Sequence, residues 1–87
     1  MAYHVYILYS DSRTKYYIGS TANVERRIKQ HNTSPAGFTK AGRPWTLAYC
    51  EDFEHKSDAL KRERYLKRMK SARFLQDLIS RKMNMDA

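Results

Sequence analysis

The stretch YHVYILYSDSRTKYYIGS, residues 3–20, decides the fold of this chain. Residues 3–9 are rich in aromatic and β-branched side chains, a composition that favours a strand. Residues 11–15 supply turn formers, and residues 16–20 return to a strand-like composition. The stretch therefore predicts an antiparallel β-hairpin.

After this hairpin, helical and extended patterns alternate. Asn23 is a suitable N-cap for a helix over residues 24–31, and Asn32 is predicted to end that helix in the αL conformation. Both prolines and two of the three glycines fall within residues 33–44, which predicts a loop. The later predicted elements are a strand over residues 45–53, a helix capped by Ser57 that runs to about Lys70, and a helix capped by Ser71 over residues 72–82.

This order of elements defines the expected architecture. We expect a small α/β domain with a three-stranded antiparallel sheet flanked by helices, in the order β-β-α-β-α-α. The last strand is apolar on both faces, so we expect it to be well covered. The domain should span residues 1–82, with residues 83–87 as a disordered tail.

The charge balance points toward an anionic partner. Seventeen Lys and Arg against nine Asp and Glu give a formal net charge of +8 and a pI near 9.8, which is typical of nucleic-acid binders. An anionic membrane is the weaker alternative, because no apolar run approaches the roughly 20 residues that span a bilayer. The N-terminus also lacks the layout of a signal peptide, so the sequence predicts a cytoplasmic protein without a membrane partner.

The cysteine content excludes two classes of protein, namely disulfide-rich domains and domains built on a Cys and His zinc motif. Cys50 is the only cysteine, so there is no disulfide framework and no zinc motif of Cys and His at ligand spacing. We therefore expect Cys50 to be a small apolar residue buried in a strand.

The first predicted helix carries two polar residues on its apolar side. At about 100° per residue, Val24 and Ile28 define the apolar stripe, and Arg27 and His31 lie within roughly 60° of Val24. Burying an unpaired cation is costly, so Arg27 and His31 must be paired or face a polar cleft.

The next predicted helix has a carboxylate in a similar position. Ala59 and Leu66 mark its inward face, and Glu63 lies between them. An inward carboxylate needs a partner. Opposite charges from two helices, beside strands that carry Tyr6 and Tyr17, resemble a functional site.

A purely structural interpretation stays open for each of these residues. Tyr6 and Tyr17 would pack in the sheet, Arg27 would extend to solvent, His31 would be a helix-end cation, and Glu63 would form an i,i+4 ion pair with Lys67.

The spacing of these residues resembles that of the GIY-YIG nuclease domain. Tyr6 and Tyr17 are eleven positions apart, and Tyr17 begins the triplet Tyr-Ile-Gly that ends at Gly19. Arg27 follows Tyr17 by ten positions, and His31 follows Arg27 by four. Every interval of the family signature is met.

The resemblance extends from about residue 3 to about residue 70. The first triplet departs from the family pattern, since His4 and Val5 stand where the family has Gly and Ile. Glu63 occupies the place of the glutamate that binds the catalytic metal in the family. Because the sequence shows no recognition loops or extra domains, we expect the chain to resemble the stand-alone, UPF0213-like branch.

The resemblance implies a metal-dependent endonuclease that cleaves DNA. Glu63 would hold one divalent cation, Mg²⁺ or Mn²⁺, and Arg27 would bind the scissile phosphate. Tyr6 or Tyr17 would take a proton from water, which requires its phenolate to be stabilised by roughly 3 pKa units. His31, Arg27 or the metal would supply that stabilisation.

Partners and substrates follow from the same resemblance. DNA is the expected partner, with repair or recombination intermediates as candidate substrates, while RNA, a protein partner and a homodimer remain open. The alternative function is a non-catalytic nucleic-acid-binding module or a partner-dependent subunit. The residues expected to contact phosphates are Arg26, Lys40, Arg43 and Lys67.

Overall fold

The computed structural model describes residues 2–33, 42–69 and 71–86. The elements, in chain order, are β1 (Tyr3–Ser10), β2 (Lys15–Thr21), α1 (Val24–Thr33), β3 (Trp45–Phe53), α2 (Lys56–Arg68) and α3 (Ala72–Asp86). The predicted fold class and the order β-β-α-β-α-α are therefore confirmed.

The three strands form one antiparallel sheet with the order β2-β1-β3. The central strand β1 is buried on both faces, as the run from Val5 to Leu8 shows. β3 is an edge strand, and the expectation that it is well covered was wrong: Leu47 is 45% exposed. The β1–β3 register also shifts between Ile7 and Leu8, which leaves Ala48 as an extra residue on β3.

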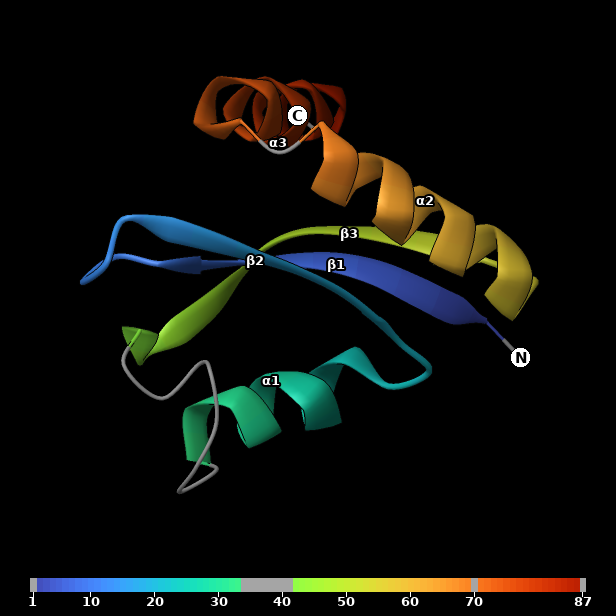
Figure 1. Cartoon of the computed structure of the whole chain (residues 1–87), viewed down its shortest axis with the longest axis horizontal. Coiled ribbons are helices and arrows are strands. Elements are labelled where there is room, and N and C mark those ends of the chain that lie inside the picture. The colour runs from blue at the N-terminus through green and yellow to red at the C-terminus, as the bar shows by residue number, and fades with distance from the viewer. Residues whose placement is uncertain (1, 34–41, 70, 87) are drawn as a thin grey trace.

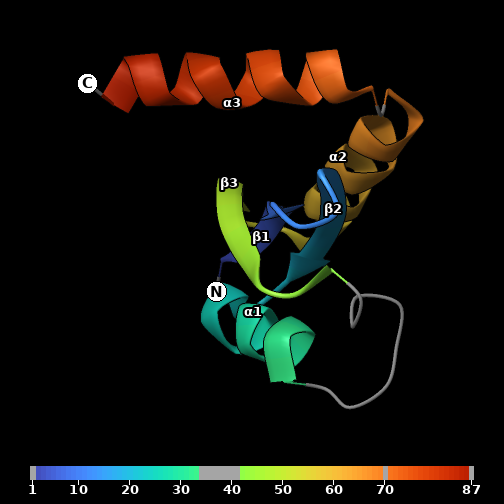
Figure 2. The same cartoon turned by 90° about the vertical axis from the view of Figure 1, so that its left-hand side faces the viewer.

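The sheet is covered on both faces. Figures 1 and 2 show α1 on one face and α2 with α3 on the other. The core is divided accordingly. On the α1 face lies a cluster of Tyr6, Leu8 and Trp45. On the α2 face the cluster comprises Val5, Ile7, Ile18, Tyr49, Ala59, Leu66 and Leu75. Because side chains alternate along a strand, neighbouring residues of β1 serve opposite cores.

The start of α1 follows the prediction, but its end does not. The Asn23 side chain accepts a hydrogen bond from the Arg26 backbone N–H at 3.0 Å, which confirms the N-cap. Asn32, predicted as a helix stop, is instead helical. Its side-chain amide donates to the Trp45 carbonyl at 3.0 Å and accepts from the Trp45 N–H at 2.7 Å. Asn32 thus ties α1 to the start of β3.

The later helices give one confirmed cap and two corrections. Ser71 accepts the Phe74 N–H at 3.1 Å, as predicted. Ser57 is not a cap: α2 begins at Lys56 after an extended His55, which makes no side-chain capping bond. α3 passes the predicted end at Lys82 and continues to Asp86, because no Gly or Pro interrupts it.

Candidate functional site

Four of the predicted site residues meet on the α1 face of the sheet. Tyr6 and Tyr17 lie on adjacent strands with ring centroids 6.4 Å apart. His31, near the end of α1, packs edge-on against Tyr17 with a centroid distance of 4.6 Å. Arg27, one turn earlier, approaches the same group. The hairpin and the first helix therefore build a single polar cluster from residues within 25 positions of one another.

The Tyr6 hydroxyl is the centre of this cluster. It lies 3.2 Å from His31 Nε2, and Arg27 Nε donates to it at 3.4 Å. Tyr6 itself is 1% exposed. Since Arg27 already donates to the phenol oxygen, we assign the phenol's own proton to His31 Nε2, the neutral acceptor.

The electrostatics of the cluster agree with this assignment. Burial lowers the pKa of His31, and the Arg27 charge lowers it further, so the imidazole is neutral near pH 7. Burial raises the pKa of Tyr6 despite the opposing hydrogen bond from Arg27, so the phenol keeps its proton. The Arg27–Tyr6 hydrogen bond raises the pKa of the guanidinium. The ground state is a hydrogen-bonded chain from Arg27 through Tyr6 to His31.

Arg27 lies at the margin of the α1 face rather than within it. The residue is exposed, and its Nη1 donates to Gln30 Oε1 at 3.1 Å. The predicted pairing is therefore present, but the guanidinium keeps contact with solvent. An exposed guanidinium beside a buried phenol can receive a phosphate from outside without burying an unpaired charge.

Gly19 makes room for the Tyr6 hydroxyl. Gly19 lies opposite Tyr6 in the β1–β2 register. A Cβ at Gly19 would lie 2.5 Å from Tyr6 Oη and 2.7 Å from Tyr6 Cζ. Any side chain at this position would collide with a phenol that is fixed by burial and by its contacts with Arg27 and His31.

The Gly19→Ala variant should therefore lose about 1–3 kcal/mol of stability, the usual range for overpacking, and should displace the Tyr6 hydroxyl. Urea unfolding of Gly19→Ala in the wild-type and Tyr6→Phe backgrounds measures this effect. Removing the hydroxyl takes away the closest clash, so the Gly19→Ala penalty should be smaller with Phe at position 6. Equal penalties in both backgrounds would contradict the contact.

Glu63 approaches from the other face of the sheet. It accepts a hydrogen bond from Ser20, whose side chain points away from the Tyr6 face, and its Oε2 lies 2.7 Å from Lys67 Nζ. The i,i+4 ion pair of the structural interpretation is thus present. The Glu63 charge still raises the pKa of Tyr6, so the two groups act on each other across edge strand β2.

The ionised form of Glu63 is favoured. Burial raises the pKa of this carboxyl, but the hydrogen bonds from Lys67 and Ser20 outweigh burial, and the net pKa is lowered. The Lys67 ammonium already forms an ion pair with this carboxylate. The carboxylate is therefore charged and oriented. One oxygen accepts a hydrogen bond from Ser20, and the other contacts Lys67, whose side chain is 53% exposed.

The residues expected to contact phosphates are differently placed. Arg26 is exposed on α1, and Lys67 is paired with Glu63. Arg43 is partly buried, and its Nε donates to the His31 carbonyl at 3.2 Å. Lys40 lies outside the described residues. Arg26 and Lys67 are both exposed, but the Lys67 ammonium is paired with Glu63. Phosphate contact stays a prediction for all four residues.

The sequence interpretation missed Ser20 as a supporting residue, and it expected Arg43 only as a phosphate contact. Ser20 orients the Glu63 carboxylate, and Arg43 holds the backbone of His31. Ser20 directly follows the Tyr-Ile-Gly triplet, yet nothing in the local sequence indicates that its partner lies 43 positions later.

Comparison with known proteins places the chain in a family. The model of the GIY-YIG catalytic domain matches residues 2–76. A UPF0213 protein of Clostridium perfringens is 42% identical over 80 residues, covering 91% of this chain and 84% of that protein. One from Halobacterium salinarum is 38% identical over 71 residues, covering 80% and 91% respectively.

A solved structure extends the similarity to three dimensions. The solution NMR structure of a UPF0213 protein from Bacillus halodurans matches with a TM-score of 0.59 and 34% identity, covering 94% of this chain and 86% of that one. These matches span most of both partners, so they concern the whole domain rather than a shared fragment. The chain belongs to the GIY-YIG catalytic domain family and, within it, to the UPF0213 proteins.

Proposed function

We propose that the protein is a metal-dependent endonuclease that hydrolyses DNA phosphodiester bonds. The observation that carries this proposal is the chain of contacts from Arg27 through the Tyr6 hydroxyl to His31 Nε2 in a member of the GIY-YIG catalytic domain family. Phosphodiester hydrolysis needs a phosphate-binding cation and an acceptor for the proton of water. This cluster offers both within one small region.

Arg27 is the proposed phosphate ligand. Its guanidinium is exposed at the margin of the α1 face, while its Nε contacts Tyr6. A planar guanidinium gives paired, charge-assisted bonds to phosphoryl oxygens and stabilises the charge that develops on them. Binding there would place the scissile phosphate beside the Tyr6 hydroxyl.

Tyr6 is the favoured proton acceptor of the two tyrosines. Its hydroxyl lies 3.2 Å from a neutral imidazole nitrogen. As the attacking water passes a proton to Tyr6 Oη, the original phenol proton moves to His31 Nε2, so a free phenolate is never required. Tyr17, whose ring stacks on Tyr6 and meets His31 edge-on, is the second candidate.

Glu63 is the proposed ligand of one divalent cation. The donor fits: Mg²⁺ is commonly bound by one or two carboxylates together with substrate phosphates, and the ionised Glu63 carboxylate already carries the Lys67 cation. When bound, Mg²⁺ or Mn²⁺ would act as a Lewis acid on the phosphate and leaving oxygen. Ser20 would keep the carboxylate oriented after the divalent cation displaces the Lys67 ammonium from it.

The proposal extends to the substrate and to the cellular location. DNA repair or recombination intermediates are the proposed substrates, and the proposed location is the cytoplasm. Within the described residues, no helix is long and apolar enough to cross a membrane. A single copy has one such cluster, so it should nick one strand, and double-strand cleavage would need a homodimer or a second encounter.

Cleavage of a supercoiled plasmid tests the proposal directly. With Mg²⁺ or Mn²⁺, relaxed nicked circles should accumulate, and a chelator should prevent them. Single-stranded, duplex, flap and branched DNA, with matched RNA, then define the substrate. Binding to these molecules without cleavage under any metal would favour the alternative of a non-catalytic nucleic-acid-binding module.

Binding to duplex DNA should depend strongly on salt and weakly on sequence, because the net charge is +8. If the contact uses roughly 4 to 6 phosphates, the slope of log K against log salt should be about −4 to −5. Fluorescence anisotropy across a salt series, without divalent metal, measures it. A slope near zero would rule out a phosphate-dominated interface.

A further inference from the structure

Three side chains with different metal-binding atoms gather at the end of the sheet where β1 begins. His4 and Asp52 face each other in the β1–β3 register, with His4 Nδ1 2.6 Å from Asp52 Oδ1. Cys50 precedes Asp52 by two positions on the same face, and its Sγ lies 3.8 Å from that oxygen. The three donor atoms all lie within 4.8 Å of one another.

The spacing of these atoms suits a small tetrahedral ion. Zinc bonds to sulfur, nitrogen and oxygen of about 2.0–2.3 Å imply donor atoms roughly 3.3–3.8 Å apart. The cysteine-to-aspartate distance already has this value, and the histidine-to-aspartate distance is shorter. The Asp52 side chain is 72% exposed, so it can turn to admit an ion without disturbing the core.

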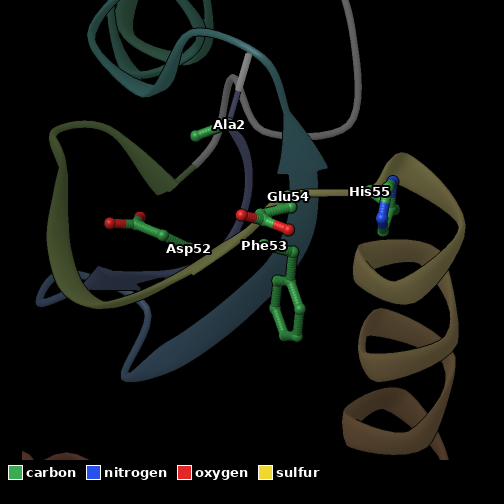
Figure 3. A pocket seen from close by; sticks show the side chains of 5 residues that line it. All are labelled: Ala2, Asp52, Phe53, Glu54 and His55. Atoms are coloured by element: carbon green, nitrogen blue, oxygen red, sulfur yellow. The ribbon is translucent and has the colours of Figure 1, made fainter.

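The site is reachable from solvent. Of the three residues, Asp52 lines an open pocket together with Ala2, Phe53, Glu54 and His55, and the Phe53 ring points away from the Asp52 carboxylate (Figure 3). His4 retains 22% side-chain exposure, and Cys50 is partly buried. A cation can therefore enter without opening the sheet.

We propose that His4, Cys50 and Asp52 bind one Zn²⁺ ion, with a water molecule as the fourth ligand. A thiolate and an imidazole select Zn²⁺ over the hard cation Mg²⁺, which prefers oxygen ligands. On binding, the ion replaces the Cys50 thiol proton, which leaves to solvent, and the ion takes the place of the His4–Asp52 contact. The site joins the N-terminal end of β1 to edge strand β3.

This site is distinct from the proposed catalytic metal ligand. Glu63 contacts Ser20 on strand β2 from the α2 face, whereas His4, Cys50 and Asp52 belong to β1 and β3 and lie on the α1 face. Sequence spacing could not reveal the site, because His4 and Asp52 are 48 positions apart. Their approach depends on strand pairing alone.

Titration of the metal-free, reduced protein with Co²⁺ and Zn²⁺ tests the proposal without DNA. Co²⁺ should bind at one equivalent and give a thiolate-to-cobalt charge-transfer band that Zn²⁺ abolishes. At free Zn²⁺ of about 100 times Kd, Tm should rise by about 10 °C or more. Cys50→Ser should remove the band, and Cys50→Ser and His4→Gln should each weaken Zn²⁺ binding by about 100-fold or more, exceeding the 10–100-fold typical of outer-shell changes.

Two control variants distinguish this site from others. Glu63→Gln should leave the cobalt band and the Zn²⁺-dependent rise in Tm intact, whatever it does to nuclease activity. Glu54→Gln removes a neighbouring carboxylate of the open pocket and should also leave both signals intact. Absence of the band in the wild-type protein, or its persistence in Cys50→Ser, would overturn the proposal.

Discussion

Replacing Arg27 by Ala should lower the rate of DNA cleavage by about 10² or more, the usual loss for one charge contact made in the transition state. Arg27 is the cation whose side chain contacts the Tyr6 hydroxyl, so its loss removes both the proposed phosphate ligand and one partner of the phenol. Single-turnover cleavage with saturating protein separates this effect from a loss of binding.

The neighbouring residue provides a matched control. Arg26 is also exposed on α1 and carries the same charge. Arg26→Ala should weaken DNA binding and leave the single-turnover rate within a few-fold of wild type. Arg27→Lys keeps the charge but loses the planar fork, so it should recover only part of the rate. Equal single-turnover losses in Arg26→Ala and Arg27→Ala would show that Arg27 acts only as general positive charge.

The local parts of the fold could be predicted from the sequence because their causes are local. Asn23 and Ser71 cap helices through hydrogen bonds to backbone groups three positions away. The hairpin follows from composition and turn residues in a continuous stretch, and the buried stripe of α2, Ala59 and Leu66, follows from helical periodicity. Each of these signals lies within one continuous stretch of the sequence.

Two of the wrong expectations depended on partners distant in sequence. Asn32 was expected to end its helix, but its amide bonds to the backbone of Trp45, 13 positions later. β3 was expected to be covered, yet strand order makes it an edge and leaves Leu47 exposed. An apolar run indicates a strand without indicating how many neighbours that strand has.

In the candidate site, too, the sequence predicted the features with local causes and not those that depend on the topology. Helical geometry placed Arg27 and His31 beside the sheet, and the structure brings both to the Tyr6 hydroxyl. The same geometry turned Glu63 inward, but the carboxylate arrives on the opposite face. Sequence periodicity gives the inward side of each helix, and only the topology decides which face of the sheet that helix covers.

Changing Glu63 to Gln should abolish metal-dependent cleavage while leaving the fold intact. The substitution removes the charge that a divalent cation requires but keeps an oxygen that can accept the hydrogen bond from Ser20. Cleavage with Mg²⁺, with Mn²⁺ and with a chelator, together with urea unfolding of the same preparation, measures both properties.

The stability change should be small because the lost ion pair is half exposed. The Lys67 side chain is 53% exposed, so losing the pair should cost about 1 kcal/mol or less, rather than the 3 to 5 kcal/mol of a buried pair. The folded pKa of Glu63 is depressed, so its charge stabilises the fold above the unfolded value of about 4.3. The cost of Glu63→Gln should therefore be present at pH 7 and fade as the pH falls below that value.

Lys67→Met separates the metal ligand from the ion pair. It breaks the same pair and retains the Glu63 carboxylate, so it should destabilise the protein about as much as Glu63→Gln does. Its cleavage should still respond to Mg²⁺, even if binding to DNA is weaker. If Glu63→Gln loses several kcal/mol and keeps metal-dependent activity, Glu63 is part of the scaffold. The catalytic cation must then be held by other groups. The proposal that Glu63 binds the metal from one face of the sheet, while Arg27 and Tyr6 act on the other, would be wrong.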